Sequence, residues 1–186
     1  MTSWSRLATR MRVPLGFAFA AAYLWFARPD WAFIAAGFVF IIAGILVRAA
    51  ASGRIRKNAE LTTTGPYAYT RNPLYLGSVL IALGFVLAAR NPWIALAAVL
   101  MFVFVYLPVI RAEEKYLMSL FPGYAAYASR VPRLLPLPRR SNLARDKENR
   151  GAFSRELYMK HREYNAALGS VVMLGVLILK MMLVQH

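Results

Sequence analysis

Apolar residues form five long stretches of this chain, with shorter polar segments between them. They cover residues 13–27, 31–47, 74–89, 93–110 and 166–184. A helix that crosses a bilayer needs about 20 mainly apolar residues. The apolar fraction of the whole chain is 59%, which is more than a soluble domain of this size usually carries. The pattern predicts an all-α integral membrane protein with about five transmembrane helices in a single membrane domain, 1–186.

Very short turns join the first four apolar stretches in pairs. The turn "RPD" (28–30) joins the first two, and "RNP" (90–92) joins the third and fourth. We therefore expect residues 13–110 to form four transmembrane helices in two hairpins. Two glycine pairs, Gly37 with Gly44 and Gly77 with Gly84, are spaced seven residues apart, which is two helical turns. Small residues on one face let membrane helices approach closely, so we expect these glycines to serve helix packing.

The positive charge is distributed as a membrane topology would distribute it. The net charge is +15, and a basic balance can indicate nucleic-acid binding. However, all of the 23 Lys and Arg residues except Arg28, Arg90 and Lys180 fall on one side of the five-span arrangement. The positive-inside rule then predicts a cytoplasmic N-terminus and an external C-terminus. We expect a bacterial inner-membrane protein that contacts anionic lipid headgroups, with no nucleic-acid partner.

Two polar segments lie on the predicted cytosolic side, residues 48–73 and 111–165. The second is expected to hold a short helix from Glu113 that ends at "PG" (122–123), and then a charged juxtamembrane helix, "RELYMKHREY" (155–164). The fifth span, 166–184, follows. Within the fourth span, Pro108 removes one backbone hydrogen bond, so it is expected to kink the helix and free the carbonyl of Phe104.

The candidate chemistry lies in these two segments. The chain has no Cys and two His, so it offers no disulfide or thiolate nucleophile, and we expect no metal site. Arg can hold a carboxylate, Glu can accept from an amine, and Tyr faces attract a sulfonium or ammonium. Each residue alone also has an ordinary explanation, such as an interfacial aromatic or a surface ion pair. The set that suits a zwitterionic or cationic ligand is Tyr67, Arg71, Asn72, Tyr75, Arg111, Glu113 and Glu114, with Tyr124 and Tyr127 further out.

Two motifs carry a resemblance to a known family. "GPYAYTRNPLYLG" (65–77) and "EEKYLMSLFPGYAAYASRVPR" (113–133) are separated by one helical hairpin. Together they resemble "GxY…RHPxYxG" and "EExxLxxxFGxxYxxYxxxVPR" of the isoprenylcysteine carboxyl methyltransferases and the related phospholipid N-methyltransferases. The resemblance covers roughly residues 40–137. The matching residues are Gly65, Tyr67, Arg71, Pro73, Tyr75, Gly77, Glu113, Glu114, Leu117, Phe121, Tyr124, Tyr127, Val131, Pro132 and Arg133.

This resemblance implies an S-adenosyl-L-methionine-dependent methyltransferase with a cofactor pocket that faces the cytosol. It implies a lipid-like or prenylated amphipathic acceptor, methylated on a carboxyl oxygen or an amine nitrogen. Three sets of residues follow from it. The cofactor-binding set is Leu61, Gly65, Tyr67, Arg71, Asn72, Pro73, Tyr75 and Glu113; the catalytic set is Arg111 and Glu114; the substrate-binding set is Arg133, Tyr124 and Tyr127.

The chain departs from the family pattern at Asn72, where the motif has His. Asn can donate and accept hydrogen bonds but does not titrate near neutral pH. If the family His binds the cofactor through a neutral nitrogen, Asn72 can replace it; if that His is a base, catalysis in this chain must differ. The chain also continues past the second motif into a fifth span. Two other classes stay open, a non-enzymatic transporter or assembly subunit and a reductase of sterols or other lipids. The methyl acceptor and the oligomeric state also stay open.

Overall fold

The computed structural model describes residues 3–56, 58–136 and 153–184, and the regular elements within these ranges are all helices, as predicted. Three helical stretches are long and apolar enough to cross a membrane: Trp31–Ser52, Pro92–Leu120 and Tyr164–Leu183. Two shorter apolar helices, Val13–Phe26 and Pro73–Ala89, coincide with the other two expected spans. The fold is therefore that of an all-α integral membrane protein.

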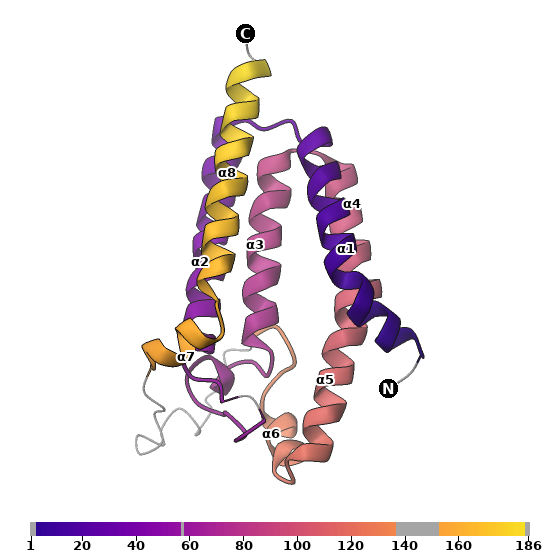
Figure 1. Ribbon diagram of the computed structural model, residues 1–186, viewed down its shortest axis with the longest axis vertical. Helices are drawn as coiled ribbons and strands as arrows, with labels where there is room; N and C mark the ends of the chain where they lie inside the picture. Colours follow the sequence, from indigo (N-terminus) through magenta and orange to yellow (C-terminus); the bar gives the residue numbers. More distant parts are fainter. Residues whose placement is uncertain (1–2, 57, 137–152, 185–186) are drawn as a thin grey trace. The chain divides into compact units, whose positions relative to one another are not determined.

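Figure 1 labels the helices. In chain order the elements are α1 (Ser3–Phe26), α2 (Trp31–Ser52), the 3₁₀-helix η1 (Gly65–Ala68), α3 (Pro73–Ala89), α4 (Pro92–Met101), the π-helix η2 (Phe102–Tyr106), α5 (Leu107–Leu120), α6 (Tyr124–Arg130), α7 (Arg155–Lys160) and α8 (Tyr164–Val184).

The chain divides into two compact units. Unit 1 consists of Met1–Ile41, Ala82–Tyr116 and Val172–His186, and unit 2 consists of Ile42–Ile81 and Leu117–Val171. Unit 1 therefore contains the two short turns that were expected to join the first four spans. Unit 2 contains the whole first motif and the second motif from Leu117 onward.

Two predicted boundaries are wrong. Helix α2 continues to Ser52, so Arg48 lies on a helix and not in a connecting segment. The cause is local, because the residues that follow Arg48 are three alanines, and Ala is the best helix former. The stretch "RELYMKHREY" is not one helix either. Helix α7 ends at Lys160, Arg162 has a left-handed φ of 53°, and α8 starts at Tyr164. Residues 137–152 of the predicted segment 111–165 lie outside the described residues.

The irregularity expected at Pro108 takes the form of a π-helix. Proline has no N–H to donate to the carbonyl four residues earlier. Helix η2 occupies Phe102–Tyr106, directly before the helical turn that contains Pro108. The N–H of Leu107 donates to the carbonyl of Phe102, five residues back. Such single π-turns inside α-helices accommodate one extra residue. The fourth predicted span is therefore built from α4, η2 and the beginning of α5.

The two short turns meet in unit 1. The N–H of Arg28 donates to the carbonyl oxygen of Ala89 over 2.8 Å. The side-chain amide of Asn91 donates to the carbonyl of Phe26 over 2.9 Å, while its oxygen accepts from the N–H of Trp93 and caps α4. Each turn therefore satisfies backbone groups at the helix ends of the other, where helices leave such groups unpaired.

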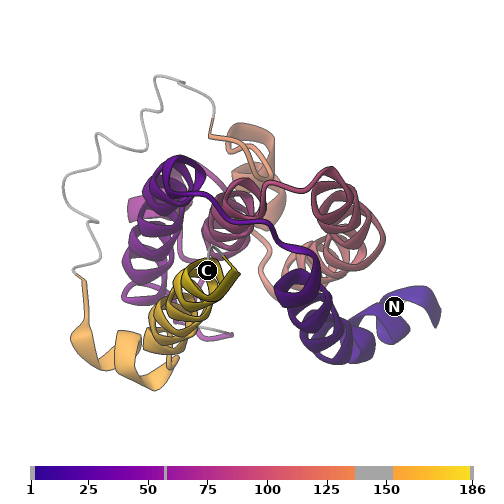
Figure 2. The same ribbon diagram turned by 90° about the horizontal axis from the view of Figure 1, so that it is seen from above.

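The core of unit 1 joins the ends of five helices. The hydroxyl of Tyr23 on α1 donates to the carbonyl of Phe85 on α3 over 2.9 Å, and the two rings meet edge to face. Figure 2 looks along the helices and shows α8 beside α2 and α3. The predicted fifth span is thus part of the packed bundle. The buried members of this core are Tyr23, Ala27, Ile34, Ala88, Ala89, Ile94, Leu177 and Met181.

The four predicted packing glycines bring α2 and α3 together. In unit 1, a Cβ on Gly37 would overlap the carbonyl oxygen of Gly84. In unit 2, a Cβ on Gly44 would lie 2.5 Å from the carbonyl oxygen of Gly77. Real Cβ atoms do not approach backbone oxygens this closely, so both positions require glycine. The interpretation of these glycines as a helix-packing face is confirmed.

Lys180 of α8 closes the C-terminal end of α1 in unit 1. Its ammonium donates to the carbonyl oxygens of Leu24, Trp25 and Ala27 over 2.7, 2.9 and 2.8 Å. The last carbonyls of a helix have no partner within the helix, and three N–H donors on one ammonium satisfy three of them. A cation at this position also complements the negative end of the helix dipole.

We expect Lys180→Met to destabilise the protein by about 2–3 kcal/mol, since hydrogen bonds from a charged donor are lost. The thermal unfolding midpoint in detergent should fall by roughly 2–4 °C for each kcal/mol. Lys160→Met is the matched control because Lys160 is exposed on α7. Equal midpoints for the two variants would contradict the capping role.

Candidate functional site

The first motif begins at a glycine that the backbone requires. Gly65 has a φ of +60°, a conformation that side-chain-bearing residues rarely adopt. A Cβ on Gly65 would also lie 2.5 Å from Cδ of Arg54. The guanidinium of Arg54 in turn donates to the carbonyl of Ala50 over 2.8 Å at the end of α2. The turn into the motif is therefore packed against the C-terminal end of α2.

Helix α3 starts within the motif, at Pro73. Proline is tolerated at the first helical position because the N–H there has no helical partner. Asn72 directly precedes it, and its carbonyl accepts from the N–H of Leu76 over 2.9 Å. Tyr75, which is half-buried, therefore lies on the first turn of α3.

The first motif is hydrogen-bonded to the later part of the second motif in unit 2. The buried hydroxyl of Tyr127 donates to the carbonyl of Tyr67 over 2.7 Å. The N–H of Arg71 donates to the carbonyl of Pro132 over 2.9 Å. Two segments about 60 residues apart in the sequence thus form one folded assembly.

Asn72 is buried and takes part in this connection. Its side-chain amide donates to the carbonyl oxygen of Arg133 over 3.0 Å. The hydroxyl of Thr70 donates to the same oxygen over 3.2 Å and accepts from the N–H of Asn72 over 3.3 Å. A neutral imidazole has one N–H and could make the same bond, so this contact requires a donor and no titrating group. Arg133 contributes its backbone to the contact, while its residue surface is exposed.

The two predicted substrate-binding tyrosines lie in a small hydrophobic core. Tyr124, Tyr127 and Val131 are buried together, and the two tyrosine rings meet edge to face at 5.9 Å. Leu61, which was predicted to contact the cofactor, packs against this cluster. These three predicted site residues therefore support the fold of the assembly.

The remaining predicted residues, Arg111, Glu113 and Glu114, belong to unit 1 and lie on α5. Glu114 is buried, with 6% of its surface exposed, whereas Arg111 and Glu113 are exposed. Consecutive residues on an α-helix point about 100° apart, so adjacent glutamates can face different surroundings. Within unit 2, the structure brings the predicted residues together, while these three belong to the other unit.

The family resemblance implies that residues 59–62 lie near the cofactor, and Thr62 is the last of them. Its hydroxyl oxygen is buried and has no hydrogen-bond partner among the described residues. Most buried polar groups are paired, so such a hydroxyl calls for an explanation. It lies three residues before Gly65 and next to Leu61, within the segment that the family resemblance places near the cofactor.

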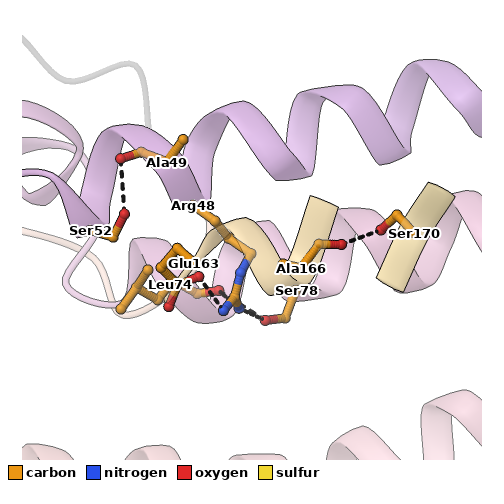
Figure 3. A network of polar contacts seen from close by, with 8 residues as sticks. All are labelled: Arg48, Ala49, Ser52, Leu74, Ser78, Glu163, Ala166 and Ser170. Atoms are coloured by element: carbon orange, nitrogen blue, oxygen red, sulfur yellow. Dashed lines mark hydrogen bonds and ion pairs between the residues drawn. The ribbon is translucent and has the colours of Figure 1, made fainter. Parts of the chain in front are cut away.

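Unit 2 contains another polar network, which the sequence analysis did not predict. Figure 3 shows it. The guanidinium of Arg48 forms an ion pair with Glu163 over 2.6 Å and donates to the carbonyl of Leu74 over 3.2 Å and to the hydroxyl of Ser78. Glu163 is an acid directly beside a spanning segment, and such acids usually have a partner or a function. The same rule applied to the fifth span would have found it.

A comparison with known families agrees with the two motifs. Residues 33–123 match the family of phospholipid methyltransferases. This match confirms the resemblance carried by the two motifs. The match contains the whole first motif and the beginning of the second, and Tyr124 to Arg133 lie beyond it. Among the described residues, no three His, Cys, Asp or Glu side chains are grouped as a metal site would need.

Two curated relatives are similar over 83 residues. The chain is 45% identical to the cobalt-zinc-cadmium resistance protein CzcN of Cupriavidus metallidurans and 42% identical to the nickel-cobalt-cadmium resistance protein NccN of Alcaligenes xylosoxydans xylosoxydans. In both cases the match covers 44% of this chain and 38% of the relative. The chain therefore spans well under half of the length of these relatives. No solved structure matches the chain.

Proposed function

We propose that the protein is an S-adenosyl-L-methionine-dependent membrane methyltransferase. Its acceptor is a lipid-like or prenylated amphipathic molecule at the boundary between membrane and cytosol, methylated on a carboxyl oxygen or an amine nitrogen. The observation that carries this proposal is the family match over 33–123, which includes the whole first motif. The distribution of the basic residues supports a site that faces the cytoplasm, in a bacterial inner membrane.

The residues present fit the proposed cofactor. Arg71, half-buried in the first motif, can hold the cofactor carboxylate in a bidentate fork. Tyr67 and Tyr75 can offer aromatic faces to a sulfonium. The buried hydroxyl of Thr62 can donate to a ligand or accept from one. Gly65, Asn72 and Pro73 shape the segment that carries these groups, and Glu113, exposed on α5, is the remaining candidate for cofactor binding.

The proposed reaction needs little general acid–base catalysis. When bound, the cofactor supplies a methyl group on a sulfonium: the acceptor's lone pair forms the new bond to carbon while the carbon–sulfur bond breaks and its electron pair stays on sulfur. A positive charge is lost at sulfur, so positioning and exclusion of water contribute most. Glu114, buried on α5, would orient an amine acceptor and take its proton. A carboxylate acceptor needs no base, and Arg111 or Arg133 would balance its charge.

The test is binding of S-adenosylhomocysteine to the purified protein, measured by calorimetry, followed by transfer of label from S-adenosylmethionine to membrane lipids. We expect binding and transfer by the unaltered chain. Absence of both would favour a non-enzymatic transporter or assembly subunit. Binding of a nicotinamide cofactor instead would favour a lipid reductase.

The variant Thr62→Val distinguishes two explanations for the buried hydroxyl of Thr62: that it binds the cofactor, or that it is simply left without a hydrogen-bond partner. If Thr62 contacts the cofactor, the variant should bind S-adenosylhomocysteine about tenfold more weakly, since a hydrogen bond is worth about 1 kcal/mol or somewhat more. Thr64→Val is the control, because the hydroxyl of Thr64 makes no capping bond to η1. A more stable Thr62→Val variant with unchanged affinity would contradict the assignment, because removing an unpaired buried hydroxyl is favourable by itself.

A further inference from the structure

The segment after the family match is attached to α2 at two points in unit 2. The N–H of Ser154 donates to the carbonyl of Gly53 over 2.8 Å, and a Cβ on Gly53 would overlap the ring of Phe153. Glu163, at the turn between α7 and α8, pairs with Arg48 one and a half turns earlier on α2. The segment 153–163 is therefore packed against the C-terminal end of α2. This is the end that the charge distribution predicts to lie on the cytoplasmic side.

Arg48 also contacts the first turns of α3. One nitrogen of its guanidinium donates to the carbonyl of Leu74 and to the hydroxyl of Ser78, while the other nitrogen holds Glu163 (Figure 3). The aliphatic part of the side chain runs over Gly77, where a Cβ would lie 2.5 Å from Cγ of Arg48. The side chains of Arg48 and Glu163 are only 21% and 11% exposed. This geometry fixes the guanidinium against the residues that flank Tyr75.

The ion pair makes the position of Arg48 depend on Glu163. A guanidinium that is largely removed from water is costly unless a carboxylate balances it. Without Glu163, Arg48 gains by turning toward water. Leu74 and Ser78 then lose the guanidinium donor, and the carbonyl of Leu74 keeps only the bond from the hydroxyl of Ser78 among the side-chain donors that the structure describes. The start of α3 would keep its bonds to the Arg133 segment through Asn72, but it would lose this second constraint.

We propose that Arg48 is a positioning residue of the first motif, and that Glu163 makes the C-terminal segment part of the support of the methyl-transfer site. This inference rests on the proposed function. It assigns a role to two residues outside both motifs, one of which lies beyond the family match. Neither residue touches the reacting atoms in this role; both act through the beginning of α3, which carries Tyr75.

The test compares Glu163→Gln with Asp30→Asn. Asp30 pairs with Arg90 over 3.9 Å, but those side chains are 42% and 57% exposed, so this pair is the matched control. We expect folded Glu163→Gln protein to bind S-adenosylhomocysteine on the order of 10- to 100-fold more weakly, because small displacements of binding groups have effects of this size. Asp30→Asn should bind like the unaltered chain.

Two further variants keep the test decisive if Glu163→Gln does not fold. Arg48→Lys keeps the charge but not the fork that reaches both α3 and Glu163, so its affinity should also fall. Glu163→Asp keeps the carboxylate and should recover part of the affinity. Unchanged affinity in folded Glu163→Gln and Arg48→Lys would overturn the inference while the proposed function stands. No binding by the unaltered chain would overturn both.

Discussion

Gly84→Ala will lower the thermal unfolding midpoint, while Gly175→Ala will leave it unchanged or raise it. A Cβ on Gly84 would lie 2.6 Å from Cγ1 and 3.0 Å from the backbone nitrogen of Ile41, and it would overlap the carbonyl oxygen of Gly37. The backbone atoms of α2 cannot turn aside as a flexible side chain can. Overpacking of this kind costs about 1–3 kcal/mol.

The control separates packing from helix propensity. Gly175 also lies inside a transmembrane helix, α8, and a Cβ there would meet nothing within 4 Å. Alanine at either position gains roughly 0.5–1 kcal/mol of backbone entropy, so the difference between the variants isolates the contact with α2. Both should be followed by thermal unfolding in one detergent. Equal midpoints would show that α2 and α3 are not in contact at Gly37 and Gly84.

Under the proposed function, Glu114→Gln will reduce methyl transfer from labelled S-adenosylmethionine to an amine-bearing lipid by at least about 100-fold, in the range of an essential proton-transfer group. The reason is the burial of Glu114, which points this carboxylate inward on α5. Glutamine keeps the size and one oxygen acceptor but cannot take a proton. The measurement is initial rate at saturating cofactor.

Glu113→Gln is the neighbouring control, since Glu113 is exposed on the same helix. We expect it to retain most of the activity or to raise the KM for the cofactor. A larger loss at Glu113 than at Glu114 would reverse the proposed roles. Equal, full activity in both variants would remove the glutamate pair from the site.

Periodic and local features of this fold were predictable from the sequence. Seven-residue spacing identified Gly37, Gly44, Gly77 and Gly84, because packing of straight helices repeats every two turns. Pro73 marked the beginning of α3 for a local reason, its missing N–H. Such features depend on residues that are close together along the chain, so they can be predicted from a single sequence.

Contacts between distant segments were not predictable in the same way. Arg48 and Glu163 are separated by 115 residues, and no spacing rule pairs them. The role of Asn72 shows a second limit. Its residue type suggested a ligand contact, but its amide is bonded to a backbone carbonyl, that of Arg133, and every residue type presents this group. A sequence pattern shows which side chains are present, but it does not show which backbone carbonyl will accept a hydrogen bond from them.

The π-helix at Phe102–Tyr106 decides which glutamate of the pair is buried. A π-turn takes up one more residue than an α-turn, so every side chain downstream is rotated by about one residue position, or roughly 100°. That rotation equals the angle between Glu113 and Glu114. A homologous chain of the same length with a regular α-helix through Phe102–Tyr106 would bury position 113, whereas a chain with one residue fewer and no π-turn would keep position 114 buried. In an alignment of such chains, position 114 should therefore remain the buried acid wherever a single deletion occurs in this turn.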